Sequence, residues 1–265
     1  MPKTPKPQNP KTPVLIRFIE KFKIMKRLEK KVCFITGGTR GIGLAIAERF
    51  GKEGAKVIIC SRKENNLNEA MDYLKDYDVD GHVCDVGDQE QRASLIDKIG
   101  ETYGRIDVLV LNVANSSFWG MQLDIDEENF DKMFSINVKG TFFAIKEAKP
   151  WLDNGTNSNI LVISSVVGQY PSSALGVYSM TKAALNNMVK FLSVELRCDG
   201  IRINAIAPGL IKTKFARNVW SSPHTDPDKV GKPEDIGGFA ATLCSEDGAF
   251  CNGEIFHVHG GFSSL

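Results

Sequence analysis

A tyrosine and a lysine four positions apart, Tyr178 and Lys182, are the residues of this sequence best suited to chemistry. On a helix this spacing places both side chains on one face, close enough to interact. A free tyrosine has a pKa of about 10, but a neighbouring ammonium favours the phenolate and lowers that pKa. The pair is therefore suited to donate a proton to a substrate oxygen. The alternative is two ordinary residues on a half-exposed helix.

A glycine-rich segment near the start of the chain predicts a nucleotide site. Residues 37–43 read Gly-Gly-Thr-Arg-Gly-Ile-Gly and stand between the apolar run Val32–Thr36 and a helical pattern over residues 44–53. Glycines allow a tight turn and close approach of the backbone to a pyrophosphate, while the helix start offers free N–H groups. This strand, loop and helix order is the context in which such a motif indicates dinucleotide binding.

The end of the second predicted strand, residues 56–60, indicates which dinucleotide binds. An NAD enzyme usually carries an acid here for the ribose 2′-hydroxyl. This chain has Ser61, Arg62 and Lys63 instead, and Arg40 in the glycine loop adds another cation. A hydroxyl and several cations suit a 2′-phosphate, so the predicted cofactor is NADPH. The alternative is that Arg62 and Lys63 are merely solvated charges.

The rest of the chain alternates strand and helix patterns and predicts an α/β fold. Strands are expected at residues 81–84, 107–111, 159–164, 201–206 and 254–258, and helices at 88–103, 127–149, 177–198 and 232–245. Such a series predicts one Rossmann-type, doubly wound parallel sheet of about seven strands flanked by helices. Ligands of these sheets bind beyond the carboxyl ends of the strands, where the glycine loop, Asp85, Asn112, Ser165 and Gly209 all fall.

Composition excludes several classes of protein. The 265 residues carry a net charge of +1, which argues against a nucleic-acid binder. Six scattered cysteines without a C-x-x-C motif suit a reducing compartment, and the four histidines lack metal-ligand spacing, so no metal is expected. No apolar run approaches the roughly 18 residues that span a membrane.

The sequence predicts an N-terminal extension of residues 1–27 ahead of a domain at 28–265 that carries all the motifs above. Residues 1–13 hold five prolines and are expected to be disordered, while residues 14–28 could form a basic amphipathic helix. Three interpretations stay open: a mitochondrial-type presequence, a membrane-surface anchor, or an appended tail ahead of a natural start at Met25.

These motifs together resemble the short-chain dehydrogenase/reductase family over about residues 28–262, so the domain at 28–265 is expected to be of this type. The resemblance rests on the glycine loop, Asn137, Ser165 and Tyr178-x-x-x-Lys182, followed by Pro208-Gly209, with Ser165 thirteen residues before Tyr178. Within the family, residues 61–63, 207–213 and 243–247 resemble the NADPH-dependent carbonyl and retinal reductases of peroxisomes. The terminal Ser263-Ser-Leu265 has the form of a weakened peroxisomal signal, so a peroxisomal or cytoplasmic location is expected, ahead of a mitochondrial one.

The resemblance implies a role for each catalytic residue. Tyr178 would protonate the carbonyl oxygen, Lys182 would lower the tyrosine pKa and hold the nicotinamide ribose, and Ser165 would hydrogen-bond the same oxygen. Asn137 would hold a water on the proton path. The alternatives are a locally satisfied Asn137 and a Ser165 that caps a turn.

The resemblance also implies cofactor contacts and an assembly. Asp85 and Val86 would flank the adenine, although Asp85 could instead be a turn former. The full set of expected contacts is Gly37, Thr39, Arg40, Gly41, Ile42, Gly43, Ser61, Arg62, Asp85, Val86, Asn112, Tyr178, Lys182, Pro208, Gly209, Ile211 and Thr213. The family further suggests a homotetramer built partly through the helices at 127–149 and 177–198.

Two segments depart from the family pattern. The Asn-Asn-Ala-Gly motif stands here as Leu111-Asn112-Val113-Ala114, and the added bulk is expected to press on the cofactor or alter strand packing. The segment 214–232 is short and contains Pro223 and Pro227, which break helices. A short, kinked lid predicts an open site with broad specificity or weakened activity.

Three functions remain as hypotheses. The first is an NADPH-dependent reductase of hydrophobic ketones, aldehydes or dicarbonyls, with pocket walls from residues 116–119, 166–177 and 215–220. The second is reduction of 3-oxoacyl thioesters, with Lys212, Lys214 and Arg217 receiving an anionic carrier. The third is a binding or structural protein that has kept the motifs of the family.

Overall fold

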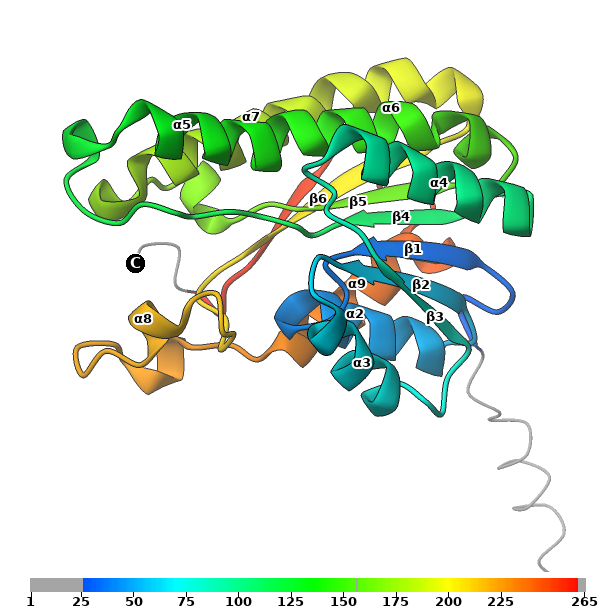
Figure 1. The fold of residues 1–265 in the computed structure, drawn as a ribbon, viewed down its shortest axis with the longest axis horizontal. Helices are drawn as coiled ribbons and strands as arrows, with labels where there is room; N and C mark the ends of the chain where they lie inside the picture. Colours follow the sequence, from blue (N-terminus) through cyan, green and yellow to red (C-terminus); the bar gives the residue numbers. More distant parts are fainter. Residues whose placement is uncertain (1–25, 156, 262–265) are drawn as a thin grey trace, which may run out of the picture.

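A seven-stranded parallel sheet forms the centre of this chain, whose computed structural model describes residues 26–155 and 157–261 (Figure 1). The strand order is β3-β2-β1-β4-β5-β6-β7, with every neighbouring pair parallel. The strands are β1 (Val32–Thr36), β2 (Lys56–Ser61), β3 (Val79–Val83), β4 (Val108–Leu111), β5 (Asn159–Ile163), β6 (Arg202–Pro208) and β7 (Ile255–Val258). The predicted doubly wound fold is confirmed, and the strand order reverses between β1 and β4.

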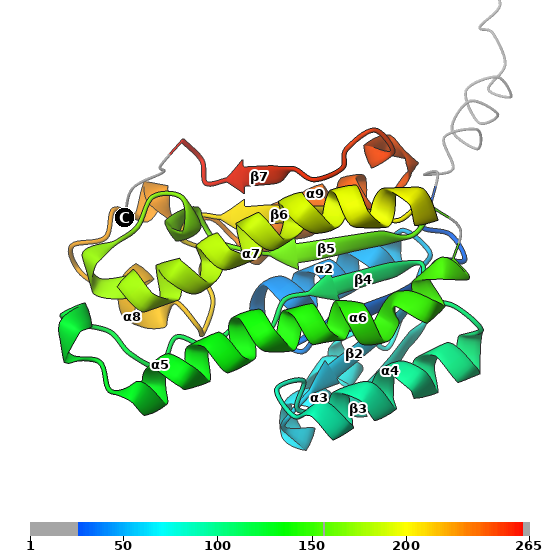
Figure 2. The same cartoon turned by 90° about the horizontal axis from the view of Figure 1, so that it is seen from above.

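Helices cover both faces of the sheet. One face carries α4 (Gln89–Tyr103), α5 (Glu127–Phe134), α6 (Gly140–Asp153) and α7 (Gly176–Glu195), and the other carries α2 (Gly41–Lys52), α3 (Glu64–Tyr73) and α9 (Pro233–Cys244) (Figures 1 and 2). The central strands are mostly apolar, as in the fully buried β1 and β5, where only Thr36 and Asn159 are polar. Such runs are typical of parallel strands that are covered on both faces.

Local signals explain several helix ends. The side chain of Asp88 accepts a hydrogen bond from Gln91 N at the start of α4, and that helix ends at Gly104, whose φ of 74° suits glycine. Asp126 caps α5 in the same way by accepting from Asn129 N. These caps lie within one residue of the predicted boundaries.

Two features of the helices were not predicted. Helix α3 fills a segment that the sequence analysis left unassigned. The long helix expected at residues 127–149 is present, but a π-helical turn at Ser135–Lys139 lies within it and separates α5 from α6. Such turns are frequent at functional sites, and this one carries Asn137.

The first described residues lie beside the amino-terminal ends of the strands. Arg27 pairs with Glu53, just beyond the end of α2, through Nη2 to Oε1 at 2.6 Å, and its Nη1 donates to Thr242 Oγ1 at 2.9 Å. Leu28 is fully buried. Of the predicted basic helix only residues 26–28 are described, and residues 27 and 28 lie in a turn; the remainder and the Ser263-Ser-Leu265 signal lie outside the described residues.

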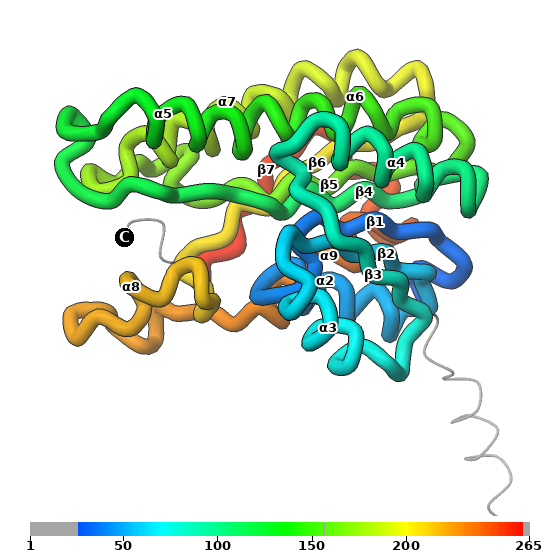
Figure 3. Tube along the Cα trace, in the orientation of Figure 1, coloured from blue at the N-terminus to red at the C-terminus, as the bar shows by residue number. Residues whose placement is uncertain are grey.

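The segment between β6 and α9 extends away from the sheet, on the same side as the start of α5 (Figure 3). It contains the single-turn helix α8 (Arg217–Trp220) and a 3₁₀ turn at Pro227–Lys229. The expectation of a lid without long helices is therefore confirmed. Trp220 Nε1 donates to Thr213 O at 2.7 Å, which folds α8 back toward the end of β6.

Candidate active site

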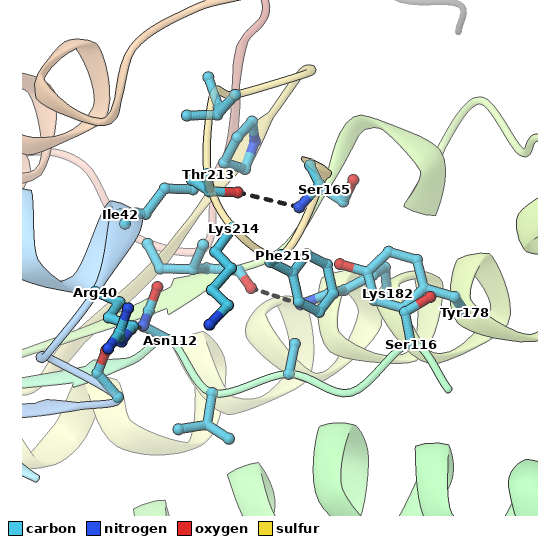
Figure 4. A pocket seen from close by; sticks show the side chains of 18 of the residues that line it. Arg40, Ile42, Asn112, Ser116, Ser165, Tyr178, Lys182, Thr213, Lys214 and Phe215 are labelled. Atoms are coloured by element: carbon cyan, nitrogen blue, oxygen red, sulfur yellow. Dashed lines mark hydrogen bonds between the residues drawn. The ribbon is translucent and has the colours of Figure 1, made fainter. Parts of the chain in front are cut away.

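A cavity of about 600 Å³ lies beyond the carboxyl ends of the strands, where a ligand of this fold was predicted. The loops that follow β1, β2, β3, β4, β5 and β6 contribute to its walls, together with the first turn of α7. Figure 4 shows Arg40 and Ile42 at one end and Ser165, Tyr178 and Phe215 at the other. The elongated arrangement joins the predicted nucleotide loop to the predicted proton donor.

The glycine loop is shaped for close approach of a ligand. Gly37 and Gly41 have φ angles of 63° and 54°, which side chains rarely adopt. A Cβ at Gly43 would lie 2.4 Å from Gly37 O, so the start of α2 packs directly on the loop. Helix α2 has no acidic residue in its first turn and no side-chain cap at Arg40, which leaves its N-terminal N–H groups available to an anion. This cradle fits the pyrophosphate of a dinucleotide.

Asn112 holds the glycine loop against β4. Its Nδ2 donates to Thr36 O and Gly37 O, both at 3.2 Å, and its backbone N–H donates to Thr36 Oγ1 at 3.0 Å. Its amide hydrogens are therefore used within the protein, while Asn112 also lines the cavity and its expected contact with the cofactor stays a prediction. Val113, which departs from the family motif, packs against the glycine loop, because a Cβ at Gly37 would lie 3.0 Å from Val113 Cγ2.

Cations and carboxylates are paired at the predicted ribose end of the cavity. Arg40 Nη2 donates to Asn66 Oδ1 and Glu69 Oε2, both at 2.8 Å. Arg62 Nη1 lies 3.7 Å from Asp85 Oδ2, and Asp85 Oδ1 accepts from the backbone of residue 87 at 2.9 Å. Asp85 is thus the turn former named as the alternative, while it also lines the cavity.

The predicted catalytic pair is buried at the other end. Tyr178 is 8% exposed and Lys182 is 2% exposed, so the half-exposed helix face named as the alternative is wrong. Lys182 Nζ donates to Ile163 O at 2.8 Å and lies 5.5 Å from the centre of the Tyr178 ring. The ring of Phe215, from the lid, lies beside that of Tyr178, with the two centroids 6.1 Å apart (Figure 4).

Burial dominates the acid–base properties of the pair. Removal from water raises the pKa of Tyr178 far above its ordinary value and lowers the pKa of Lys182 to about 7. The direction for Tyr178 is opposite to the one expected from the ammonium alone. The phenol is therefore held protonated at neutral pH, which is the form that a proton donor needs.

Ser165 and Asn137 both have structural partners. Ser165 starts a 3₁₀ turn at Val166–Gly168 and its Oγ accepts from Val167 N at 3.4 Å. Asn137 is fully buried; its Oδ1 accepts from Asn115 N at 2.6 Å, and its Nδ2 donates to Asn115 O at 2.9 Å and Thr181 Oγ1 at 3.0 Å. The side chain of Asn137 thus joins the loop after β4 to α7, and its two hydrogens are not available to the expected water.

The loop after β6 brings the remaining predicted residues to the cavity. A Cβ at Gly209 would lie 2.7 Å from His259 Cβ, so this position requires glycine. Ile211 is 5% exposed and pairs with residue 231 in an isolated bridge. Thr213 reaches across to the glycine loop, because a Cβ at Gly41 would lie 3.0 Å from Thr213 Cγ2.

The cavity contains most, but not all, of the predicted site. Thr39, Gly43 and Asn137 support its walls without lining it, and Phe118, Tyr170 and Trp220 are also absent from the lining. Other lining residues were not predicted from the sequence, among them Cys60, Asn66, Cys84 and Ile163. Cys60, Cys84 and Ile163 lie at or directly after the ends of strands, so strand ends could have indicated them; nothing in the sequence singles out Asn66.

Comparison with known proteins agrees with this geometry. A family model described as Enoyl-(Acyl carrier protein) reductase matches residues 37–263. The chain belongs to the short-chain dehydrogenase/reductase family, a family of oxidoreductases that use a nicotinamide cofactor.

Similar curated proteins include Dehydrogenase/reductase SDR family member 4 from Bos taurus, 37% identical over 244 residues that cover 88% of each chain. The human protein of the same name is 37% identical over 247 residues, or 89% of each chain. A solved 3-ketoacyl-(acyl-carrier-protein) reductase from Brucella melitensis, complexed with NADH, has a TM-score of 0.84 at 26% identity and covers 89% of this chain and 100% of its own. The recognition of the family from the sequence is confirmed.

Within residues 26–155 and 157–261, no group of three or more His, Cys, Asp or Glu is placed to hold a metal ion. No described helix is long and apolar enough to cross a membrane.

Proposed function

We propose that this protein is an NADPH-dependent carbonyl reductase that acts on hydrophobic ketones, aldehydes or dicarbonyls. The observation that carries the proposal is the cavity itself. It has an anion-binding glycine loop at one end and, at the other, a buried Tyr178 whose neighbour Lys182 is also buried. The cofactor, when bound, supplies the hydride that the carbonyl carbon receives.

The side chains would divide the work at the carbonyl oxygen. Tyr178 donates its proton to that oxygen, and burial keeps the phenol protonated until the substrate is present. Ser165 donates a second hydrogen bond as negative charge develops there. The ammonium of Lys182, in its protonated form, stabilises the phenolate that Tyr178 leaves behind. Asn137 keeps α7 in position through Thr181, so we assign it a positioning role.

Apolar side chains at the mouth favour a hydrophobic substrate. Leu175 and Val167 are buried beside Tyr178, while Trp119 and Phe215 line the cavity and remain 56% and 58% exposed. Exposed aromatic rings at the mouth of a cavity are typical of a site that binds apolar ligands. The short lid leaves room for substrates of different shapes.

The second candidate is reduction of 3-oxoacyl thioesters. The acyl-carrier descriptions of the matching family model and of the Brucella structure favour it. Lys212, Lys214 and Arg217 are exposed near the lid and offer an anionic carrier a basic surface. A non-catalytic binding role remains a third possibility that the same experiment tests.

The decisive experiment measures NADPH oxidation with retinal, α-dicarbonyls, steroid ketones and an acetoacetyl thioester. We expect activity with the apolar carbonyls, and a loss of about 10³-fold in kcat in Tyr178→Phe with NADPH binding retained. Preference for the thioester would support the second candidate. Absence of turnover with every compound would support a binding role, and an undiminished Tyr178→Phe rate would refute the assigned proton donor.

The proposed NADPH preference rests on Arg40, Arg62 and Lys63 around the ribose end. Arg62→Asp should raise KM for NADPH by about tenfold or more while leaving KM for NADH within about twofold, because only NADPH carries the 2′-phosphate. The measurement is initial rates with both cofactors. Lys75→Asp is a matched control, because Lys75 is an exposed cation outside the cavity. An Arg62→Asp variant that still prefers NADPH would contradict the assignment.

A further inference from the structure

Lys214 is the first residue of the lid whose side chain enters the cavity. It lines the cavity together with Arg40 and Gly41, and it also borders a smaller neighbouring depression with the same two residues. Thr213, the preceding residue, packs against the Gly41 position. In Figure 4 the Lys214 side chain extends into the cavity, with its ammonium on the side of Arg40 and Asn112 and away from Tyr178.

The charge of Lys214 is not neutralised within the described part of the chain. Arg40 pairs with Glu69 at 2.8 Å, and Arg62 lies 3.7 Å from Asp85. Lys212, two residues away, lies over the ring of Trp220 with Nζ 5.4 Å from its centre. Among residues 26–155 and 157–261, Lys214 has no carboxylate partner and no side-chain hydrogen bond, although its neighbours on both sides of the cavity do.

The ammonium faces a second source of positive potential. Across the cavity lies the N-terminus of the 12-residue helix α2, whose first turn holds no acid and whose N-cap, Arg40, makes no side-chain cap. The positive end of the helix dipole and a lysine that share one volume repel each other when that volume is empty and together attract an anion. Because they border the same stretch of the cavity, the matching ligand group is a phosphate held between the lid and the loop.

We propose that Lys214 binds the pyrophosphate of the nicotinamide dinucleotide and thereby joins the lid to the cofactor. The inference rests on the proposed dinucleotide site, and it assigns to the lid a charge-assisted contact that the glycine loop alone does not supply. The side chain is exposed and flexible, so it gains order when the anion binds. The contact lies at the part of the ligand that NADPH and NADH share, so Lys214 contributes affinity without discriminating between them.

The test compares Lys214→Gln with Lys212→Gln, which removes an equal charge two residues away from a side chain that does not line the cavity. Both positions are exposed, so both variants are expected to fold. Dissociation constants are measured by calorimetry for NADPH, NADH and adenosine 2′-monophosphate, which has no pyrophosphate. Titrations at two salt concentrations report how many ion contacts form.

For Lys214→Gln we expect the dissociation constants of NADPH and NADH to rise by the same factor, about tenfold, with a weaker salt dependence. Adenosine 2′-monophosphate should bind as it does to the unaltered protein, and Lys212→Gln should change all three constants by less than about twofold.

Several results would overturn the inference. They are unchanged dinucleotide affinity in Lys214→Gln, an equal loss for adenosine 2′-monophosphate, or a loss restricted to KM for the carbonyl. The dissociation constants are measured without turnover, so the result for Lys214→Gln does not depend on whether the protein reduces a carbonyl. Failure of the unaltered protein to reduce any carbonyl would refute that function while the Lys214 comparison still stands.

Discussion

Lys182 is a costly residue for the fold, because an ammonium group is held where water is almost excluded. The hydrogen bond that its Nζ donates to Ile163 O does not offset the loss of hydration, and the pKa of Lys182 falls to about 7. The neighbouring Tyr178 responds in the opposite direction, with a raised pKa. At the scale of single residues, the groups needed for proton transfer are therefore held where their charged forms are poorly solvated, and this lowers the stability of the fold.

Replacing Lys182 with methionine should stabilise the protein and abolish carbonyl reduction. The unfolded chain binds more protons than the native one between pH 7 and about 10.5, so the stability of the unaltered protein rises with pH across this window. The gain in Lys182→Met should be full below pH 7, on the order of several kcal/mol as the fall in the pKa of Lys182 from 10.5 to about 7 implies, and should shrink toward pH 10. Thermal unfolding at pH 6, 8 and 10 measures it.

A gain in melting temperature that is equal at all three pH values would show that lost charge burial is not its cause. Lys190→Met is a suitable control, because Lys190 is exposed on the same helix and pairs with Glu254 at the surface. Its effect should be small and independent of pH in this range.

At the scale of elements, the glycine loop and the start of α2 form one packed unit with the end of β4. Asn112 is the connecting residue, since its amide reaches both Thr36 O and Gly37 O. The catalytic end is connected in a similar way, because Asn137 in the π-helical turn joins the loop after β4 to Thr181 of α7. The two ends of the cavity are thus fixed to the same strand.

Gly43→Ala should disrupt this unit. The added methyl group would lie 2.4 Å from Gly37 O and 2.6 Å from Asn112 Nδ2, so the loop must move. We expect a loss of about 1–3 kcal/mol in the free energy of unfolding and at least tenfold weaker dinucleotide binding. Denaturant unfolding and calorimetry measure the two quantities.

Gly238→Ala in α9 is the matched control for this substitution. It is also a helical glycine, but the nearest atom to its added methyl group is Arg49 Nη1 at 3.6 Å. Alanine in an open helical position should be neutral or stabilise by up to about 1 kcal/mol. Equal behaviour of the two variants would contradict the close packing of loop and helix.

Much of this arrangement follows from the sequence, and the exceptions have physical reasons. Strand ends and the Tyr178–Lys182 spacing are local patterns, so the sheet and the catalytic face could be predicted. The π-helical turn around Asn137 depends on contacts with residues 22 and 44 positions away, which no local pattern shows. The pKa of Tyr178 depends on burial in the assembled core, so reasoning from Lys182 alone gave the wrong direction.

At the scale of the whole molecule, the outer face of α7 has the character of an interface. Met180, Phe191 and Val194 are 51%, 48% and 74% exposed, and their spacing places them along one side of the helix. A homotetramer that uses this face remains our proposal, in agreement with the expectation from the family.

Phe191→Glu should therefore lower the assembly state, since it places a charge in an apolar contact between two copies. Sedimentation or light scattering would show a mass half that of the unaltered protein or less. Tyr73→Glu on α3, at 56% exposure on the opposite face of the sheet, should leave the mass unchanged. A Phe191→Glu protein with unaltered mass would refute this interface.

The attachment of Arg27 to Glu53 has a practical consequence for the use of the protein. Helix α2 starts at the cavity and ends beside Arg27, about 18 Å away along its axis. A linker attached ahead of residue 26 would therefore leave the protein beside the amino-terminal ends of the strands, whereas the cavity lies beyond their carboxyl ends. Protein immobilised through such a linker should keep the opening of its cavity toward the solution, so that carbonyl substrate and alcohol product can exchange freely.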